Sequence, residues 1–171
     1  MNEFSIETDD PRRGDVAALL ERHLAFCRET TPPEHTFALD LSGLLDPAIT
    51  FFSVRRDGRL LGIGALKELD PTHGEVKSMH TAAEARGIGV GRAIVEHLLA
   101  TAAARGYARL SLETGTMDAF APARNLYADV GFAPCEPFAD YVASPNNAFM
   151  TLELAGRGRR RRPRAPRQAR A

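Results

Sequence analysis

The chain has 171 residues, carries 22 basic and 22 acidic side chains, and is 44% hydrophobic. This is the length and composition of one globular domain that buries a full core, so no second domain is needed. No apolar run approaches the ~20 residues that a membrane-spanning helix requires, and the polar start Met1–Glu3 is unlike a signal peptide. We therefore expect a cytoplasmic protein with no membrane partner.

The balanced formal charge conceals a basic C-terminal tail. Residues 156–171 contain eight arginines and no acidic residue, which leaves the rest of the chain with 14 basic and 22 acidic residues. The tail repels itself and has almost no side chain that could be buried, so it is expected to be disordered. We expect a folded domain over residues 1–155, and nucleic acid could bind only through the tail.

The hydrophobic pattern predicts a mixture of strands and helices along the body of the chain. Strands are expected at residues 3–7, 49–55, 60–66, 75–80, 108–113 and 148–154, and helices near residues 16–26, 39–45 and 90–105. Asp9 or Asp10 followed by Pro11 is typical of a helix start, so the first helix is expected to begin there. The dipeptide Asp57-Gly58 is a hairpin signal between the second and third strands. This order of elements favours an α/β fold with three layers, in which helices cover both faces of a mixed sheet.

A glycine-rich segment, Arg86-Gly87-Ile88-Gly89-Val90-Gly91-Arg92, joins a predicted strand to a predicted helix. Glycines let a ligand approach the backbone, and the first N–H groups of a helix have no internal partner. Such a turn binds phosphate oxygens, and the two arginines favour a diphosphate. A Walker loop is excluded because no Lys-Ser or Lys-Thr follows the glycines. A Rossmann motif is excluded because Arg92 stands where that motif needs glycine.

Two ordered motifs carry a resemblance to a known family. Residues 86–91 form an R-x-x-G-x-G pattern, and residues 123–132 (ARNLYADVGF) contain an asparagine, a tyrosine and a Gly-Phe pair. Together they resemble the GNAT superfamily of acyl-CoA-dependent N-acetyltransferases. Residues 111–115 and 135–141 resemble its YsnE-type bacterial subgroup.

The resemblance implies a mostly antiparallel mixed sheet that splays between strands 75–80 and 108–113, where the acyl-CoA thioester inserts. It implies transfer of an acetyl group from acetyl-CoA to a primary amine of a small molecule or protein, directly in a ternary complex and with no metal ion. The residues expected to bind the cofactor are Met79, Thr81, Arg86, Gly87, Ile88, Gly89, Val90, Gly91, Arg92 and Asn125.

Acetyl transfer to an amine requires a base, donors for the oxyanion and an acid for the leaving thiolate. Glu75 lies eleven residues before Arg86, where the histone-acetylating branch of the superfamily has its glutamate base, and a solvated strand-edge glutamate or a water relay is the alternative. The N–H of Met79 is the expected oxyanion donor. Tyr127 is the expected acid, with packing in the helix as its alternative. Glu136 and Asp140 are expected to help Glu75 make the mouth of the cleft anionic.

Other catalytic chemistries have less support in the sequence. The histidines, at positions 23, 35, 73, 80 and 97, show no metal-ligand spacing, and neither Cys27 nor Cys135 is expected beside the cleft motifs, so an acyl-enzyme is unsupported. A non-catalytic acyl-CoA-binding module and a nucleic-acid-associated protein are the alternative functions. The sequence leaves open the acceptor and whether the chain forms a homodimer.

Overall fold

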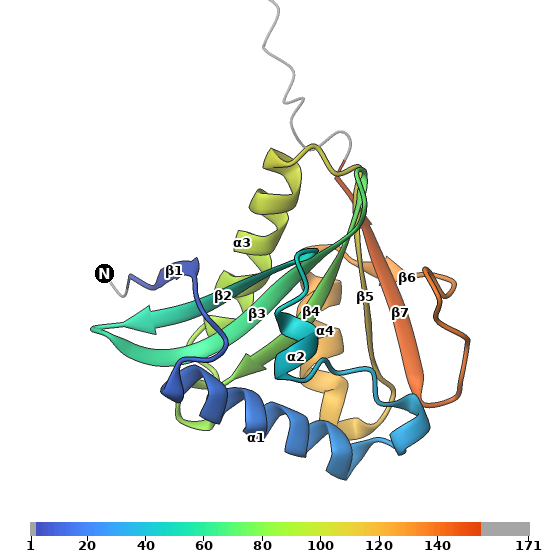
Figure 1. Ribbon diagram of the computed structural model, residues 1–171. Helices are drawn as coiled ribbons and strands as arrows, with labels where there is room; N and C mark the ends of the chain where they lie inside the picture. The colour runs from blue at the N-terminus through green and yellow to red at the C-terminus, as the bar shows by residue number, and fades with distance from the viewer. Residues whose placement is uncertain (1–2, 155–171) are drawn as a thin grey trace, which may run out of the picture.

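A computed structural model of the protein describes residues 3–154, which form one seven-stranded sheet in the order β1-β2-β3-β4-β5-β7-β6 (Figure 1). The strands are β1 Ser5–Thr8, β2 Ile49–Arg56, β3 Arg59–Asp70, β4 His73–Thr81, β5 Arg109–Gly115, β6 Ala133–Pro134 and β7 Asn147–Glu153. Only β4 and β5 run parallel, and all other neighbours are antiparallel. The predicted tail, residues 156–171, and residues 1, 2 and 155 of the predicted domain lie outside the described residues.

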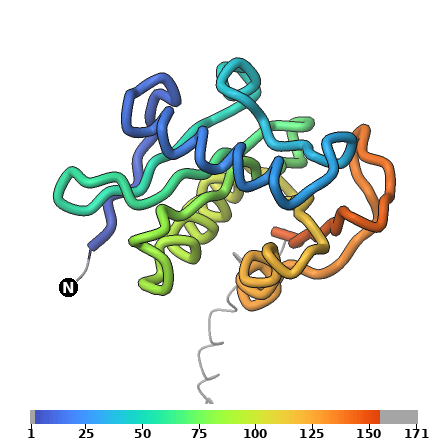
Figure 2. The backbone as a smooth tube through the Cα atoms, turned by 90° about the horizontal axis from the view of Figure 1, so that it is seen from below, coloured from blue at the N-terminus to red at the C-terminus, as the bar shows by residue number. Residues whose placement is uncertain are grey.

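Helices cover both faces of this sheet. They are α1 Gly14–Thr30, α2 Leu41–Leu44, α3 Val90–Ala104 and α4 Ala121–Val130, with 3-10 turns η1 Pro33–His35, η2 Ala83–Ala85 and η3 Asp118–Phe120. Seen from below, α1 lies on one side of the sheet and α3 and α4 lie on the other (Figure 2). The predicted three-layer mixed α/β fold is confirmed.

Helix α3 packs unusually close to the centre of the sheet. Its apolar face is buried, and Val90 and Ile94 on it are at most 1% exposed. On β3 it meets Gly62 and Gly64, where an added Cβ would come within 2.8 Å of Val90 and 2.6 Å of Ile94. Glycine is therefore required at these two strand positions, and the close contact fixes the start of α3 against the sheet.

The two parallel strands separate halfway along their length. β4 pairs with β5 only from His73 to Val76, and each strand then continues away from the other (Figure 1). Beyond this point β4 is still paired with β3, and β5 with β7. The predicted splay lies where the sequence analysis expected it, and it opens a gap in the middle of the sheet.

Some element boundaries differ from those predicted. Helix α1 begins at Gly14 and not near Pro11, because the Asp10 carboxylate accepts hydrogen bonds from the backbone and side chain of Arg12 and holds residues 10–13 in a turn. The strand β6 has only two residues and was not predicted, because so short a strand leaves no periodic pattern in the sequence.

Candidate active site

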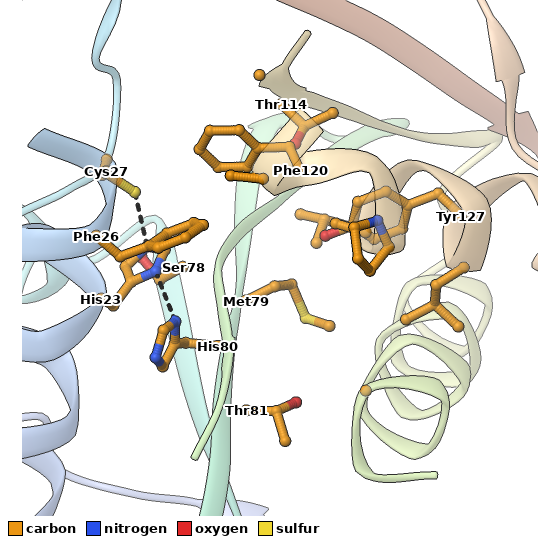
Figure 3. A pocket seen from close by; sticks show the side chains of 18 of the residues that line it. His23, Phe26, Cys27, Ser78, Met79, His80, Thr81, Thr114, Phe120 and Tyr127 are labelled. Atoms are coloured by element: carbon orange, nitrogen blue, oxygen red, sulfur yellow. Dashed lines mark hydrogen bonds between the residues drawn. The ribbon is translucent and has the colours of Figure 1, made fainter. Parts of the chain in front are cut away.

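A cavity of about 630 Å³ occupies the gap between the separated strands (Figure 3). One wall is formed by α1 and the segment that follows it, and the opposite wall by α4 and the glycine-rich loop before α3. The ends of β4 and β5 form the base. Because these walls come from both layers of helices, the cavity connects the two faces of the sheet.

The glycine-rich loop forms one end of the cavity. Gly87 and Gly89 have φ values of +79° and +92°, which side chains other than glycine rarely adopt, and Gly89 is the N-cap of α3. The backbone N–H groups of residues 87–92 donate to no backbone acceptor among the described residues. With the exposed Arg86 guanidinium beside them, these N–H groups make an anion-binding end.

The strand β4 carries a bulge where it passes along the cavity. Ser78 and Met79 both lie opposite Gly64 of β3, and Ser78 has a φ of +54°. The Oγ of Ser78 is buried and finds no hydrogen-bond partner among residues 3–154. A bulge leaves part of the hydrogen-bonding ladder unpaired, so it presents polar backbone to the cavity.

Tyr127 comes from α4 and lines the cavity opposite this bulge (Figure 3). Its ring stands at 65° to that of Phe132, with 5.8 Å between the centroids, and Gly131 ends the helix with a φ of +117°. Burial, with a smaller contribution from Glu113, raises the pKa of Tyr127 well above its usual value. The phenol therefore holds its proton at every physiological pH.

Glu75 is buried, with 2% of its surface exposed, and does not line the cavity. Its carboxylate accepts a hydrogen bond from the Tyr141 hydroxyl and lies 3.4 Å from Lys77 Nζ. The alternative of a solvated strand-edge glutamate is wrong, because β4 is a central strand and Tyr141 covers this position. Lys77, which does line the cavity, separates Glu75 from it.

A second carboxylate, Glu113, lies on β5 and lines the cavity together with Tyr127. Its Oε2 accepts a hydrogen bond of 3.0 Å from Asn147 Nδ2. Burial raises its pKa, against the opposing effects of Asn147 and Lys77. Sequence reasoning missed this residue, because its signal was a single acidic position in a predicted strand.

Sequence reasoning also missed a cluster of His23, Cys27 and His80 on the α1 side of the cavity (Figure 3). The Nδ1 atoms of the two histidines lie 3.3 Å apart, and Cys27 Sγ lies 3.9 Å from His23 Nε2. Desolvation lowers the pKa of both histidines to about 4 and raises that of Cys27 to about 11. The expectation that neither cysteine lies near the cleft is wrong for Cys27, since α1 runs across the gap.

Most of the predicted cofactor-binding residues do line the cavity: Met79, Thr81, Arg86, Gly87, Gly89, Val90, Gly91 and Arg92. Ile88 at the tip of the loop and Asn125 do not. Ile88 is 47% exposed. Asn125 is exposed because it lies two residues before Tyr127, and such positions point to different sides of a helix.

The expected contribution of Glu136 and Asp140 to the mouth is wrong. Both line a separate depression of about 650 Å³, which also includes Arg109 and Cys135. The reason is that β6 pairs with β7 and carries the following loop to that side.

An aromatic contact spans the cavity from one wall to the other. Phe26 of α1 and Phe120 of η3 meet at an interplanar angle of 64°, with 5.1 Å between their centroids. Phe120 also fills the space beside Gly115, where an added Cβ would lie 2.4 Å from its ring. Arg124 fixes this segment by donating to the carbonyl oxygens of Gly115 and Met117.

Neither a metal site nor a membrane span is evident in the part of the chain that the structure describes. Residues 3–154 contain no group of three histidine, cysteine or acidic side chains that could hold a metal ion. None of the helices formed by these residues is long and apolar enough to cross a membrane.

A family model and three relatives identify the chain as similar to acetyltransferases. Residues 16–132 match the Acetyltransferase (GNAT) family. The chain is 48% identical to the uncharacterized N-acetyltransferase YsnE of Bacillus subtilis, over 87% of this chain and 99% of YsnE. It is 46% identical to the uncharacterized N-acetyltransferase YedL of Escherichia coli, over 88% of this chain and 95% of YedL. An IAA acetyltransferase of Azospirillum brasilense is 35% identical, over 90% of this chain and the whole of that protein.

Solved structures share the fold. A Klebsiella pneumoniae protein described as an acyl-CoA N-acyltransferase superimposes with a TM-score of 0.75 at 27% identity, over 90% of this chain and 99% of that one. A GNAT acetyltransferase of Elizabethkingia anophelis, solved with acetyl-CoA bound, gives a TM-score of 0.66 at 14% identity, over 90% and 99% of the two chains. The chain belongs to the GNAT family of acetyltransferases.

Proposed function

We propose that the protein transfers an acetyl group from acetyl-CoA to a primary amine, directly within a ternary complex. The observation that carries this proposal is the continuity of the cavity. One space of about 630 Å³ joins the phosphate-binding loop, the bulge of β4 and the hydroxyl-bearing Tyr127. A thioester bound along it and an amine entering from the other side of the sheet would meet at the bulge.

The coenzyme lies along the α3 side of the cavity in this proposal. Its diphosphate binds the free N–H groups of residues 87–92, and the arginines Arg86 and Arg92 complement its charge. Its amide-bearing arm runs beside Met79 to Thr81, where the edge of β4 has lost its pairing with β5. The buried Ser78 Oγ, which lacks a protein partner, is a further polar group available to the ligand.

The chemistry at the thioester uses two groups in this proposal. The N–H of Met79, on the bulge, stabilises the oxyanion, a contribution typically worth about 10²-fold or more in rate. Tyr127 donates its proton to the sulfur as the C–S bond breaks, and the pKa of this phenol ensures that the proton is present.

The acceptor must lose a proton before or during attack, since an alkyl ammonium ion has a pKa of about 10.4. Glu75 is the base proposed from its spacing to Arg86. Because it does not line the cavity, it would take a proton from Lys77 Nζ, 3.4 Å away, as Lys77 takes one from the acceptor. Glu113 is the carboxylate that touches the cavity itself. Both acidic groups favour an amine over an acidic acceptor.

The protonation of Cys27 favours direct transfer over an acyl-enzyme. Cys27 lines the cavity, but desolvation raises the pKa of its thiol to about 11, so little of the nucleophilic thiolate exists near neutral pH. The use of acetyl-CoA favours a cytoplasmic location. A non-catalytic acyl-CoA-binding module is the alternative, and the cavity-lining phenol of Tyr127 argues against it.

Release of coenzyme A thiol from acetyl-CoA tests the proposal, across a panel of amines, amino acids, polyamines, aminoglycosides and peptides. IAA belongs in the panel, because one relative is named for it. Thiol release that depends on one class of amine is the expected result. Tight binding of coenzyme A without thiol release from any acceptor would instead support the binding module.

A further inference from the structure

Glu113 places a carboxylate at the acceptor end of the cavity, and Lys77 is the cationic group that acts on its pKa. Its carboxylate is held by Asn147 Nδ2 at 3.0 Å, and no cationic side chain of the described residues forms an ion pair with it. Apart from Lys77, the side chains that line this end include the neutral groups Thr31, Thr36 and Thr114. A half-buried carboxylate that accepts one hydrogen bond keeps further acceptor capacity for a ligand donor.

Lys77 is the one cation that lines this end among the described residues, and its ammonium group is already occupied. Its Nζ lies 2.8 Å from the Tyr141 hydroxyl, 3.2 Å from the carbonyl oxygen of Phe37 and 3.4 Å from Glu75. Two of its three protons are donated, to Tyr141 and Phe37, and its charge is paired with that of Glu75. The charge of Lys77 is therefore largely balanced before a carboxylate of an acceptor could reach it.

The remaining cations of the cavity lie elsewhere. Arg86 and Arg92 belong to the glycine-rich loop, at the end assigned to the coenzyme diphosphate. His23 and His80 have pKa values of about 4 and are therefore neutral near pH 7. His35 also lines the cavity, and its Nδ1 is 2.9 Å from the side-chain amide of Asn146.

We propose that Glu113 binds the acceptor in its ammonium form, and that the site accepts amines lacking a carboxylate and rejects α-amino acids. This inference rests on the proposed acetyltransferase function and adds the acceptor class to it. An α-carboxylate would approach the Glu113 carboxylate without a counter-charge and would lose its hydration with no compensating contact. Phe26, Phe37 and Phe120 line the same space and fit an acceptor with an apolar or aromatic body.

Matched pairs of acceptors test the proposal: tyramine with tyrosine, histamine with histidine, and agmatine with arginine. In each pair the two compounds share the amine and the body and differ by the carboxylate. The expected result is a kcat/KM at least about tenfold higher for the decarboxylated member of the preferred pair. This measurement uses the parent protein and needs no variant.

The variant Glu113→Gln tests whether Glu113 causes the preference for amines that lack a carboxylate. The substitution keeps the shape and removes the charge, so the ratio of kcat/KM within a pair should fall several-fold toward one. A merely structural role would lower both members equally and leave the ratio unchanged. Glu29→Gln, at an exposed position on α1 outside the cavity, is the matched control and should preserve the ratio.

Each outcome bears on a separate part of the proposal. Amino acids acetylated as well as their decarboxylated partners would overturn the inference and leave the acetyltransferase function standing. An unchanged ratio in folded Glu113→Gln would overturn the role of Glu113. A protein that acetylates no amine at all would overturn the proposed function and this inference with it.

Discussion

The two ends of the cavity are built in different ways. The end proposed for the coenzyme is one continuous segment, residues 86–92, in which a tight turn before a helix leaves the N–H groups of residues 87–92 with no backbone acceptor within residues 3–154. The end proposed for the acceptor is assembled from side chains of separate elements, with Lys77 on β4 and Glu113 on β5. Tyr141, in the loop before β7, accepts a hydrogen bond from Lys77 and does not itself line the cavity. A site made of local backbone can be read from sequence, whereas a site made of distant side chains cannot.

Tyr127 lies between the two ends, and removing its hydroxyl should have the largest effect. We expect Tyr127→Phe to lower kcat by about 10²-fold or more with little change in acetyl-CoA affinity, because the acid acts mainly in the transition state. Steady-state kinetics and calorimetric titration measure the two quantities.

Tyr107→Phe is the matched control. Tyr107 is also buried, but its hydroxyl donates to Glu68 at 2.8 Å and does not line the cavity. Its loss should leave kcat unchanged and cost about 1 kcal/mol of unfolding free energy. Near-parental turnover in Tyr127→Phe would show that Tyr127 is a packing residue and that its hydroxyl takes no part in transfer between the two ends.

At the coenzyme end, Gly89→Glu should weaken coenzyme A binding by about tenfold or more. A glutamate there introduces a negative charge at the proposed diphosphate site and must adopt a φ of +92°. The protein itself leaves room for the side chain, since no atom lies within 4 Å of an added Cβ. Calorimetric titration of the folded variant measures the affinity.

Gly58→Glu separates strain from charge. Gly58 has a φ of +77° and the same open surroundings, but it lies in the turn between β2 and β3. Its substitution should cost similar strain and leave coenzyme A affinity unchanged. Parental affinity in both variants would show that the loop does not hold the diphosphate.

At the acceptor end, Glu75→Gln should lower turnover several-fold, most strongly below the pH at which free amine is abundant. The proposed base is needed only while the acceptor is protonated, so high pH should partly restore the rate. The pH–rate profile of the folded variant measures this. A profile identical to that of the parent would mean that Glu75 only balances the charge of Lys77.

The smallest effect concerns stability and pH. His23 and His80 have pKa values of about 4 in the fold and about 6.5 when unfolded, so the unfolded state binds more protons between these values. Their contribution to stability is therefore present above pH 6.5 and is lost as the pH falls toward 4.

His23→Leu should reduce the loss of unfolding free energy between pH 7 and 4.5 by about 1–2 kcal/mol. This range is lowered to allow for solvent at the pair, because His80 is only half-buried. Denaturant unfolding at the two pH values measures the difference. An equal loss in parent and variant would mean that the buried pair does not titrate as described.

The fold followed from the sequence because its signals are local. The glycine turn, the Asp57-Gly58 hairpin and the apolar face of α3 each fix one element, and the resemblance supplied their arrangement. The start of α1 differed because it is set by a single side chain, Asp10, whose hydrogen bonds compete with the helix.

The site could be predicted only in part, for a physical reason. The residues of the loop and Tyr127 belong to contiguous motifs. Glu113 and Cys27 enter the cavity because two strands separate and α1 crosses the gap, and these events depend on tertiary packing. Glu75 had the expected position in the chain, but its burial depends on Tyr141, 66 residues away.

In the proposed function the acetyl group passes directly from the thioester to the amine, with no acetyl group held on the protein. Cys27 is the cavity-lining thiol of the described residues and thus the site at which an acyl-enzyme would form. Initial rates with acetyl-CoA and the preferred amine, combined with the intact mass of the protein after acetyl-CoA alone, test the claim. Direct transfer predicts intersecting double-reciprocal lines and an unmodified protein. Parallel lines, with an acetyl group on Cys27 that the amine removes at the rate of turnover, would contradict it.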